Sequence, residues 1–460
     1  MSARSSQKKF NPYLYFIASV AGLCGLLFGF NTAVISGAML FLKSDFALTP
    51  QNIEVIVSAV LFGAVIGCCF GKFTDQFGRR TILVIITLIF SISSLVCAMT
   101  PNVAGLIVGR VTIGIAIGIA SYTAPLYLAE ISPTQSRGFL VSFNQLGITL
   151  GILAAYATNY LFSDTGDWRM MLGLGMIPAL LLFVGMVFLP ESPRWMVVRG
   201  LHGGARAILK KIRNSEDIDQ ELNEIKEALA YKQSGLFSKN VIRVLLLAGL
   251  LMVFSQIDGI NTLIYYAPTV FNLSGFKQNT IAILATLGIG VVNVLFTLIT
   301  MPLLDRVGRK PLLFIGVGCM TLSLFTLGLI FSISTFHSTF ESLSLFSILL
   351  YVAGFAIGLG PVSWLIAAEV IPLHLRGSGI ALVTACNWMS NMFVSFLFLT
   401  SLQSFGIHLF WLFSGLCIVT IFFIYRYIPE TKGTSLEKIE INLQNGVKLR
   451  DIGNAHELTK

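Results

Sequence analysis

Carboxylate and basic side chains recur at matched spacings in two parts of the chain. The repeated patterns are E-x-x-P-x-x-x-R-G, D-x-x-G followed by two basic residues, and Pro-Glu, and each occurs once in either half. The side chains that could pair are Asp75, Arg79, Arg80, Glu130, Arg137, Glu191, Arg194, Asp305, Arg309, Glu369, Arg376 and Glu430. Ion pairs of this kind can hold two elements together in one conformation and release them in another, so we predict a latch. A role limited to positive charge and helix caps would explain the Arg and Lys residues but not the repeated Glu and Pro.

The repeated patterns lie between long apolar segments. Hydrophobic residues make up 55% of the 460 residues and charged residues only 12%, against about 25% charged residues in soluble domains. The apolar residues fall into runs of about 20, the length that crosses a bilayer as a helix. The sequence therefore predicts an all-α membrane protein with twelve transmembrane helices, roughly at 12–35, 53–71, 82–99, 103–127, 140–162, 170–189, 243–272, 280–304, 311–332, 345–368, 378–402 and 407–428.

The repeats follow equivalent spans, which predicts two similar six-helix halves. The predicted divisions are a tail at 1–11, a first half at 12–189, linker helices at 190–242, a second half at 243–428 and a tail at 429–460. Nearly all Lys and Arg residues lie on the side of both termini; the exceptions are Lys43, Arg110, Arg169 and Lys277. Because cytoplasmic loops are rich in these residues, we predict a multi-pass protein of the cytoplasmic (plasma) membrane with both termini in the cytoplasm.

Several kinds of chemistry find no support in the sequence. The net charge of +9 follows from the predicted topology and does not indicate nucleic-acid binding. The cysteines lie in apolar runs without a C-x-x-C pair and the histidines have no metal-ligand spacing, so no metal site is expected. The chain lacks the G-x-x-x-x-G-K-[ST] phosphate loop and any nucleophile near a membrane face, so we expect neither a cofactor nor an enzyme. Polar residues are scattered over unlike helices, which disfavours a channel.

Five motifs in order resemble those of the sugar porter family of the major facilitator superfamily, which includes glucose facilitators and bacterial sugar/proton symporters. They are Gly71…Asp75…Gly78-Arg79-Arg80, Gly109-Arg110, Pro190-Glu191-Ser192-Pro193-Arg194-Trp195, Gly259-Ile260-Asn261…Tyr265-Tyr266 and Pro429-Glu430-Thr431-Lys432-Gly433. The resemblance covers about residues 12–433. It implies the major facilitator fold and movement of a monosaccharide, a hexose or a pentose, across the membrane by alternating access.

The resemblance also implies a sugar site built from spans 5, 7, 8, 10 and 11. The matching residues are Gln145, Ile148, Ile152, Gln256, Asn261, Asn293, Phe355, Trp364, Asn387, Trp388 and Asn391. Amides donate to and accept from hydroxyls, and aromatic rings cover the apolar face of a pyranose, so the expected partner is a small neutral sugar. Each amide could instead join two packed helices. Ser255 departs from the family pattern, because many members have a second Gln before Gln256.

Three residues bear on energy coupling. Proton symporters of the family carry an Asp in span 1 close to the arginine that Arg110 matches, whereas facilitators carry Asn, as this chain does at Asn31. Since Asn31 cannot titrate, we predict downhill uniport. Asp258 in span 7 leaves two alternatives open: a proton carrier, because ionisable residues inside membranes are commonly functional, or a hydrogen-bonded structural residue. If span 7 is a regular helix, Asp258 shares a stripe with Ser255 and Asn261.

A sugar sensor of the same fold would share every motif and is a second alternative, although the tail after residue 428 is short and has no obvious interaction motif. The predicted partners are a neutral sugar and the lipid bilayer, with protons added only if transport is coupled. The oligomeric state stays open, and a monomer is sufficient for transport.

Overall fold

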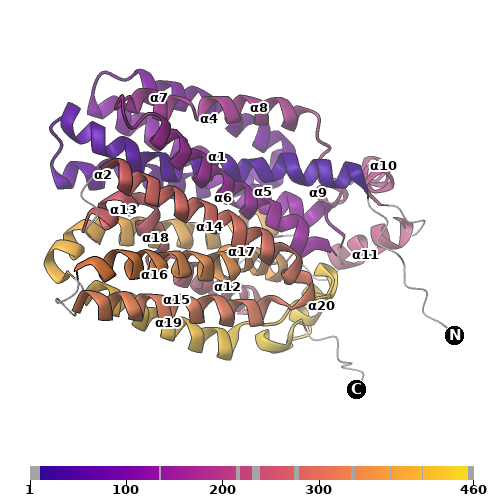
Figure 1. Ribbon diagram of the computed structural model, residues 1–460. Coiled ribbons are helices and arrows are strands. Elements are labelled where there is room, and N and C mark those ends of the chain that lie inside the picture. The colour runs from indigo at the N-terminus through magenta and orange to yellow at the C-terminus, as the bar shows by residue number, and fades with distance from the viewer. Residues whose placement is uncertain are drawn as a thin grey trace.

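The computed structural model describes residues 11–133, 136–213, 218–230, 239–273, 279–332, 337–372, 375–406 and 408–453, and the regular structure within these ranges is entirely helical. Long helices run side by side, with the first half of the chain above the second in Figure 1. Twelve segments of the described chain are long and apolar enough to cross a membrane. The predicted all-α membrane fold with twelve spans is confirmed.

The first six spans come from seven helices. They are α1 (Pro12–Asp45), α2 (Pro50–Cys68), α4 (Arg79–Met99), α5 (Val103–Ile131), α6 (Arg137–Leu161) and the consecutive pair α7 (Trp168–Gly173) and α8 (Met176–Val187). Side-chain caps set several starts: Asn11 accepts hydrogen bonds from the backbone N–H groups of Tyr13 and Leu14 at the start of α1, and Thr49 accepts one at the start of α2. The caps explain why these helices begin at polar residues just before the apolar runs.

The last six spans contain two broken helices. They are α12 (Lys239–Ile257) with α13 (Ile260–Leu273), α14 (Asn279–Arg306), α15 (Arg309–Ser332), α16 (His337–Ile357) with α17 (Leu359–Val370), α18 (Arg376–Phe405) and α19 (His408–Tyr427). The break between α12 and α13 has Gly259 at φ +90°, a conformation that favours glycine. The break between α16 and α17 lies at Gly358. Each break exposes backbone polar groups in mid-span, where they need partners other than their own helix.

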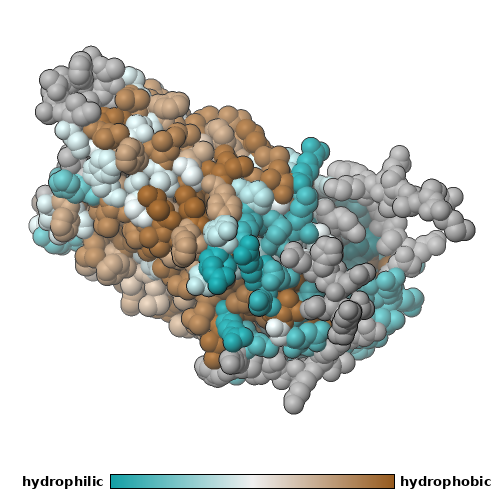
Figure 2. Space-filling view, turned by 90° about the horizontal axis from the view of Figure 1, so that it is seen from below, coloured by the Kyte–Doolittle hydropathy of each residue, from teal (hydrophilic) through white to brown (hydrophobic). Residues whose placement is uncertain are grey.

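Short amphipathic helices gather at one end of the bundle. They are α3 (Gly71–Phe77), α9 (Pro193–Val198), α10 (His202–Ile212), α11 (Ile218–Ala230) and α20 (Leu436–Gln444), followed by a 3-10 turn at Leu449–Asp451. Helices α9, α10, α11 and α20 lie at the right of Figure 1. Figure 2 shows hydrophilic side chains gathered at this end and an apolar surface over much of the remainder. We call this end the latch end and the opposite one the far end.

The two halves meet mainly along two pairs of helices. Within the first half α1 packs on α6 and α2 on α5, while between the halves α6 packs on α14 and α2 on α18. A relative movement of the halves therefore has to change contacts along α2, α6, α14 and α18.

Candidate functional site

In the first half, the repeated charged residues form a buried cluster at the latch end. Arg79 Nη2 lies 3.1 Å from Glu130 Oε1 and 3.3 Å from Asp75 Oδ1. Glu130 also accepts a hydrogen bond from the Ser192 hydroxyl. Burial raises the pKa of Asp75 above its ordinary value, and the Arg79 guanidinium opposes that rise. The cluster connects α3, α4 and α5, at the latch end, to the residues that follow α8.

The second half repeats this arrangement with its own residues. Arg309 Nη2 lies 3.0 Å from Glu369 Oε1, and Arg309 Nη1 lies 3.5 Å from Asp305 Oδ1. Glu369 accepts a hydrogen bond from the Thr431 hydroxyl, as Glu130 does from Ser192. The duplication seen in the sequence is therefore also a duplication of contacts.

The two repeated Pro-Glu carboxylates bind the first backbone N–H groups of helices. Glu191 accepts from the backbone N–H groups of Arg79, at 2.9 Å, and Arg80, at 3.2 Å. Glu430 does the same for residues 309 and 310, at 3.1 and 3.0 Å. Burial raises the pKa of Glu191, and the N–H donors partly offset the rise. Arg80 does not form the ion pair that the sequence predicted. Its guanidinium donates instead to the backbone carbonyls of Met186 and Val187.

An ion pair joins the two halves directly. Arg137, at the start of α6, donates from Nε and Nη2 to Glu369 Oε1 of α17 at 3.0 and 2.9 Å, and from Nη2 to the Thr434 carbonyl at 3.1 Å. Arg137 and Glu369 are each 1% exposed. The side chain of Arg376, the repeat of Arg137, lies outside the part of the chain that the structure describes. Glu369 thus connects a cluster in its own half to a helix of the other half.

Two aspartates cap helices that belong to the opposite half. Asp75 Oδ2 accepts from the backbone N–H and the hydroxyl of Ser378 on α18, both at 3.2 Å, and Asp305 Oδ2 accepts from the backbone N–H of Phe139 on α6 at 3.0 Å. Anions are favoured at these helix starts by the exposed N–H groups and the helix dipole. Each half thus supplies one aspartate that caps a helix of the other half, and both contacts require the halves to be close at the latch end.

The glycine of each R-G pair makes these caps possible. A Cβ at Gly377 would lie 2.1 Å from Asp75 Oδ1, and a Cβ at Gly138 would lie 2.4 Å from Asp305 Oδ1. Real Cβ atoms do not approach other atoms so closely, because packed atoms resist such overlap. The repeated glycine is therefore explained by a carboxylate that arrives from the other half.

The C-terminal helix α20 adds a connection that the sequence analysis did not include. Arg194 Nη2 lies 2.9 Å from Glu437 Oε1. Burial alone would lower the pKa of Arg194, but Glu437 and neighbouring carboxylates raise it above its ordinary value. The residues after the last span are therefore part of the latch end.

Several of the predicted sugar-site amides form one hydrogen-bonded cluster at the break between α12 and α13. Gln256 Nε2 donates to Asn387 Oδ1 at 2.9 Å and to Ser255 Oγ at 3.3 Å, and Asn261 Nδ2 donates to Gln256 Oε1. The Ser255 hydroxyl donates to the Met252 carbonyl at 2.8 Å, and its oxygen lies 3.3 Å from Asn387 Oδ1. Ser255, where many family members have a second Gln, therefore still joins this cluster. The cluster links α12, α13 and α18 through neutral groups only.

The two other predicted residues on α18 point to different neighbours. Trp388 donates from Nε1 to Ser121 Oγ on α5 at 3.0 Å, and its ring centroid lies 5.1 Å from that of Phe28 on α1. Asn391 Nδ2 donates to the Tyr265 hydroxyl on α13 at 3.2 Å. Trp388 therefore sits between the two halves, with indole contacts to both α5 and α1.

The remaining predicted residues are distributed over three spans. Gln145, Ile148 and Ile152 are buried on α6, Asn293 is buried on α14, and Phe355 and Trp364 are half-buried on α16 and α17. Among the described residues, no hydrogen bond joins Gln145 or Asn293 to the Gln256 cluster. A Cβ at Gly360 would lie 3.2 Å from Gln145 Nε2, so Gln145 reaches the start of α17 across the interface between the halves.

Among the described residues, no hydrogen bond or ion pair joins any two of the three residues considered for energy coupling. Asn31 donates to the Leu27 carbonyl of its own helix at 3.3 Å. Arg110 is 1% exposed and donates from Nε to the Ile56 carbonyl at 2.8 Å. No carboxylate in the described parts of the chain lies within ion-pair distance of Arg110.

Asp258 lies at the helix break and not on the stripe considered in the sequence analysis. Because α12 ends at Ile257, the condition of a regular helix fails, and Asp258 Oδ1 accepts from the Ile260 backbone N–H at 3.2 Å. The Tyr351 hydroxyl donates to the Asp258 carbonyl at 2.9 Å. Asp258 Oδ2 has no hydrogen-bond partner among the described residues, and the residue borders a cavity of about 30 Å³ inside the second half. Asp258 therefore faces away from Ser255 and its amide neighbours.

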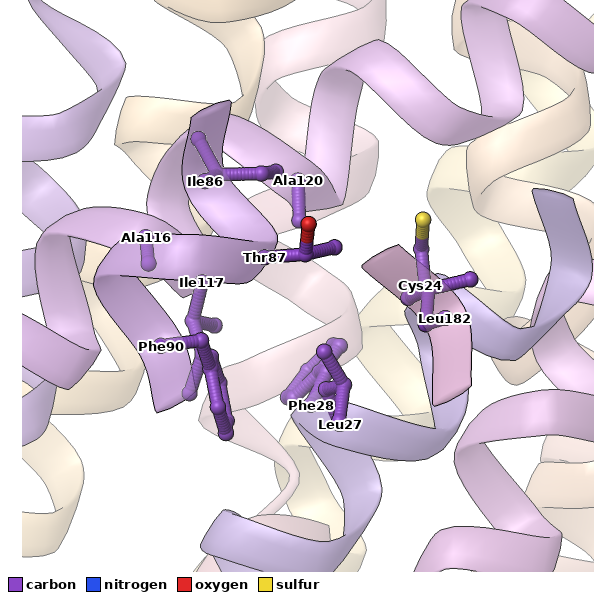
Figure 3. Close-up of a pocket in the computed structure, with 10 residues that line it drawn as sticks. All are labelled: Cys24, Leu27, Phe28, Ile86, Thr87, Phe90, Ala116, Ile117, Ala120 and Leu182. Carbon is purple, nitrogen blue, oxygen red and sulfur yellow. The ribbon is translucent and has the colours of Figure 1, made fainter. Parts of the chain in front are cut away.

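A second cavity, inside the first half, is too small and too apolar to hold a sugar. Figure 3 shows its lining, which includes Phe28, Phe90 and Leu182 with Thr87 as a hydroxyl-bearing member. Its volume is about 10 Å³, close to the minimum for one water molecule. We regard it as a packing void between α1, α4, α5 and α8.

Comparison with known proteins agrees with this architecture. A family model described as "Sugar (and other) transporter" matches residues 17–443. The galactose-proton symporter of Escherichia coli strain K12 is 42% identical over 450 residues, which are 96% of this chain and 97% of that protein. This chain belongs to the sugar porter family of the major facilitator superfamily. It is therefore a multi-pass membrane protein of a transporter family and not an enzyme.

Solved structures of relatives differ in how closely they match this sugar porter. A proton:xylose symporter bound to 6-bromo-6-deoxy-D-glucose matches with a TM-score of 0.86 at 34% identity, covering 93% of this chain and 98% of that one. The inward-open conformation of the xylose transporter from E. coli gives 0.73 at 33% identity, with 93% and 99% covered. The lower score for the inward-open form agrees with the contacts that close the latch end here.

Two acidic residues of this sugar porter make contacts that the sequence analysis missed. Glu54 on α2 accepts hydrogen bonds from Thr400 on α18, and Glu437 pairs with Arg194. Glu54 lies within an apolar span, and a carboxylate in such a place was a usable signal. Nothing in the sequence pointed to the contact of Glu437, because an acidic residue in a terminal segment is ordinarily solvated.

Proposed function

We propose that this sugar porter carries a monosaccharide, a hexose or a pentose, across the cytoplasmic membrane by alternating access, with both termini in the cytoplasm. The cluster of Gln256 and Asn387, which are buried, and Asn261, which is half-buried, is the main support, because neutral donors and acceptors suit the hydroxyls of an uncharged ligand. The names of the relatives support both sugar classes, since one is a galactose and another a xylose transporter. The excess of Lys and Arg at the latch end supports the orientation.

The contacts that join the two halves support alternating access. The Arg137–Glu369 pair and the caps made by Asp75 and Asp305 link the halves at the latch end. A sugar can leave towards the cytoplasm only after these contacts separate, so we assign the cluster the role of a cytoplasmic gate. A purely structural latch would keep the same contacts throughout the cycle.

We infer further that transport is downhill. Coupling through Arg110 needs a neighbouring carboxylate whose protonation releases the arginine. Asn31 cannot take that part, and Arg110 bonds to a backbone carbonyl instead. Relatives that are proton symporters favour the opposite conclusion, so the assignment depends on Asn31.

Proton symport through Asp258 is the second candidate. The observation that favours it is a 1% exposed carboxyl group whose Oδ2 has no partner among the described residues and which borders a cavity. A buried carboxyl without a cation is costly when ionised, so a bound proton would suit the site. Against it, the cavity that Asp258 borders is lined only by residues of the second half, and no ion pair joins Asp258 to Arg110 among the described residues.

The experiment for both readings is transport by purified protein in proteoliposomes. Counterflow, in which internal unlabelled sugar drives uptake of labelled sugar, should be saturable for at least one monosaccharide in a panel of hexoses and pentoses. A sugar sensor would bind sugar without counterflow, and a channel would give uptake without counterflow.

Matched variants separate the coupling modes. The parent should not accumulate sugar under an imposed proton gradient, whereas Asn31→Asp should gain proton-driven accumulation if the span 1 carboxylate is the missing part. If the parent does accumulate sugar, and Asp258→Asn abolishes accumulation while counterflow stays, transport is coupled through Asp258 and the downhill assignment is wrong.

A further inference from the structure

Among the residues that the structure describes, one carboxylate joins the two halves at the far end of the molecule. Glu54 Oε1, one turn into α2, accepts hydrogen bonds from the backbone N–H of Thr400 at 3.2 Å and from its hydroxyl at 3.1 Å. Glu54 is only 4% exposed, whereas Thr400 is exposed. Because α2 belongs to the first half and α18 to the second, this contact has to break if the halves separate at the far end.

A similar contact occurs at the other end of α18, which is the latch end. Asp75 accepts from the backbone N–H and the hydroxyl of Ser378, near the start of α18, as Glu54 does from Thr400 near its end. Helix α18 is thus bound at both ends by a carboxylate of the first half, and each carboxylate takes both donors of one Ser or Thr. The pairing at the latch end was proposed above as part of a gate, so the matching contact marks a position where a second gate would act.

The chemical surroundings of the two carboxylates differ. Asp75 lies 3.3 Å from Arg79, whereas no Lys or Arg in the described ranges lies within ion-pair distance of Glu54. A buried carboxylate that has no cation depends on its hydrogen-bond donors or on water. When α2 and α18 are together, Thr400 supplies the donors; when they part, water can replace them. The contact can therefore open without leaving the carboxylate unsatisfied.

We propose that Glu54 is a gating residue of the transport cycle: with Thr400 it closes the far end, and it separates from Thr400 when the sugar site opens to that end. In the orientation proposed above, the far end is outside the cell. Tyr266 and Phe398, whose rings stack with centroids 5.5 Å apart, lie on the same side of the site. This inference rests on the proposed alternating access.

A cysteine between the gate and the site reports on opening. Ser395 is fully buried on α18, between Asn391 and Thr400, and donates to Asn391 Oδ1 at 3.0 Å. In a background with the native cysteines replaced, Ser395→Cys in nanodiscs is alkylated by a soluble maleimide without sugar. Glu54→Ala removes both hydrogen bonds from Thr400, and it should speed this alkylation at least about tenfold, because even one hydrogen bond to a charged group contributes about 1.5 kcal/mol. Glu54→Gln and Thr400→Val, which keep part of the contact, should give smaller increases.

The control is a carboxylate at the same end that stays within one half. Asp45 Oδ2 accepts from Trp168 Nε1 at 2.7 Å, between α1 and α7, so Asp45→Asn should leave the Ser395→Cys rate unchanged. Equal rates in the parent and Glu54→Ala, or an equal increase in Asp45→Asn, would overturn the proposal. If gel filtration shows that Glu54→Ala is not folded, the labelling rates of Glu54→Gln and Thr400→Val are compared with those of the parent and Asp45→Asn instead.

A compensation test separates a gate from a purely local packing role. Glu369→Gln weakens the opposite end, so it should reduce the labelling rate of the Glu54→Ala protein towards that of the parent. No compensation would mean that Glu54 acts only locally. Failure of the proposed function looks different, because the parent would then give no sugar counterflow at all, whereas failure of the gate would leave counterflow intact and labelling unresponsive.

Discussion

Replacement of Arg137 by methionine tests the latch with little change to the rest of the cluster. Arg137→Met keeps a long side chain but loses the donors to Glu369, at 2.9 and 3.0 Å, and to the Thr434 carbonyl. Glu369 retains Arg309 at 3.0 Å and the Thr431 hydroxyl. The carboxylate is therefore not left unpaired, which would itself be strongly destabilising.

The size of the effect follows from the number of bonds lost. A hydrogen bond to a charged group contributes about 1.5–3 kcal/mol, and the two bonds from Arg137 share one oxygen that Arg309 still occupies. We therefore take about 3 kcal/mol for the whole contact, which at about 1.4 kcal/mol per factor of ten corresponds to a shift of about 100-fold towards forms with an open latch end.

The distance between the halves at the latch end measures this shift. Spin labels at Lys72→Cys on α3 and Arg306→Cys on α14, both exposed, report on the two halves by double electron–electron resonance in a background without native cysteines. Arg137→Met should move the distribution to longer distances. Arg213→Met is the control, because Arg213 pairs with Glu221 at 2.8 Å in the linker and donates to the Ile131 carbonyl of α5 at 2.6 Å, and neither contact reaches the second half. An unchanged distribution in Arg137→Met, or the same change in Arg213→Met, would refute the latch.

Three further outcomes are expected. Gly377→Ala should open the latch end in the same distance measurement without removing a charge, because its Cβ would displace Asp75 from Ser378; an unchanged distance would contradict this role for glycine. Burial in the closed latch raises the pKa of Asp75 above its ordinary value, so the closed form binds a proton more tightly. Lowering the pH should therefore favour closure, and the effect should be complete below the ordinary pKa of an aspartate. It should fade as the pH rises through the raised pKa of Asp75 in the closed latch. The Asp75→Asn variant should not show this pH dependence. Gln145→Ala and Trp364→Ala should each weaken sugar binding by about 1 kcal/mol or more with unchanged gel filtration, as measured by calorimetry; unchanged affinity in both would remove them from the site.

The sequence was sufficient for the architecture because two signals were strong. Apolar length and the sorting of Lys and Arg are properties that the bilayer imposes on every span, and the structure has the same twelve spans. The repeated Glu130 and Glu369 patterns likewise indicated paired contacts, and the structure pairs Arg79 with Glu130 and Arg309 with Glu369. The cross-half role of Gly138 and Gly377 was not readable, because it depends on which helix starts face each other.

The parts that the sequence did not predict depend on local breaks and on tertiary partners. The interruption of span 7 at Gly259 turns Asp258 away from Asn261, and no hydropathy pattern marks such a break. Glu54 and Glu437 looked like single acidic residues until α18 and α9 were placed against them. The sugar-site residues came from the family resemblance, and their role stays a prediction.

The most direct test of the central claim is sugar movement by the unmodified protein in proteoliposomes, measured with and without an imposed proton gradient. The account predicts saturable counterflow of a monosaccharide and no accumulation above equilibrium in either condition. Accumulation that requires the proton gradient and disappears with a protonophore would contradict downhill transport, and absence of counterflow for every sugar tested would contradict sugar transport itself.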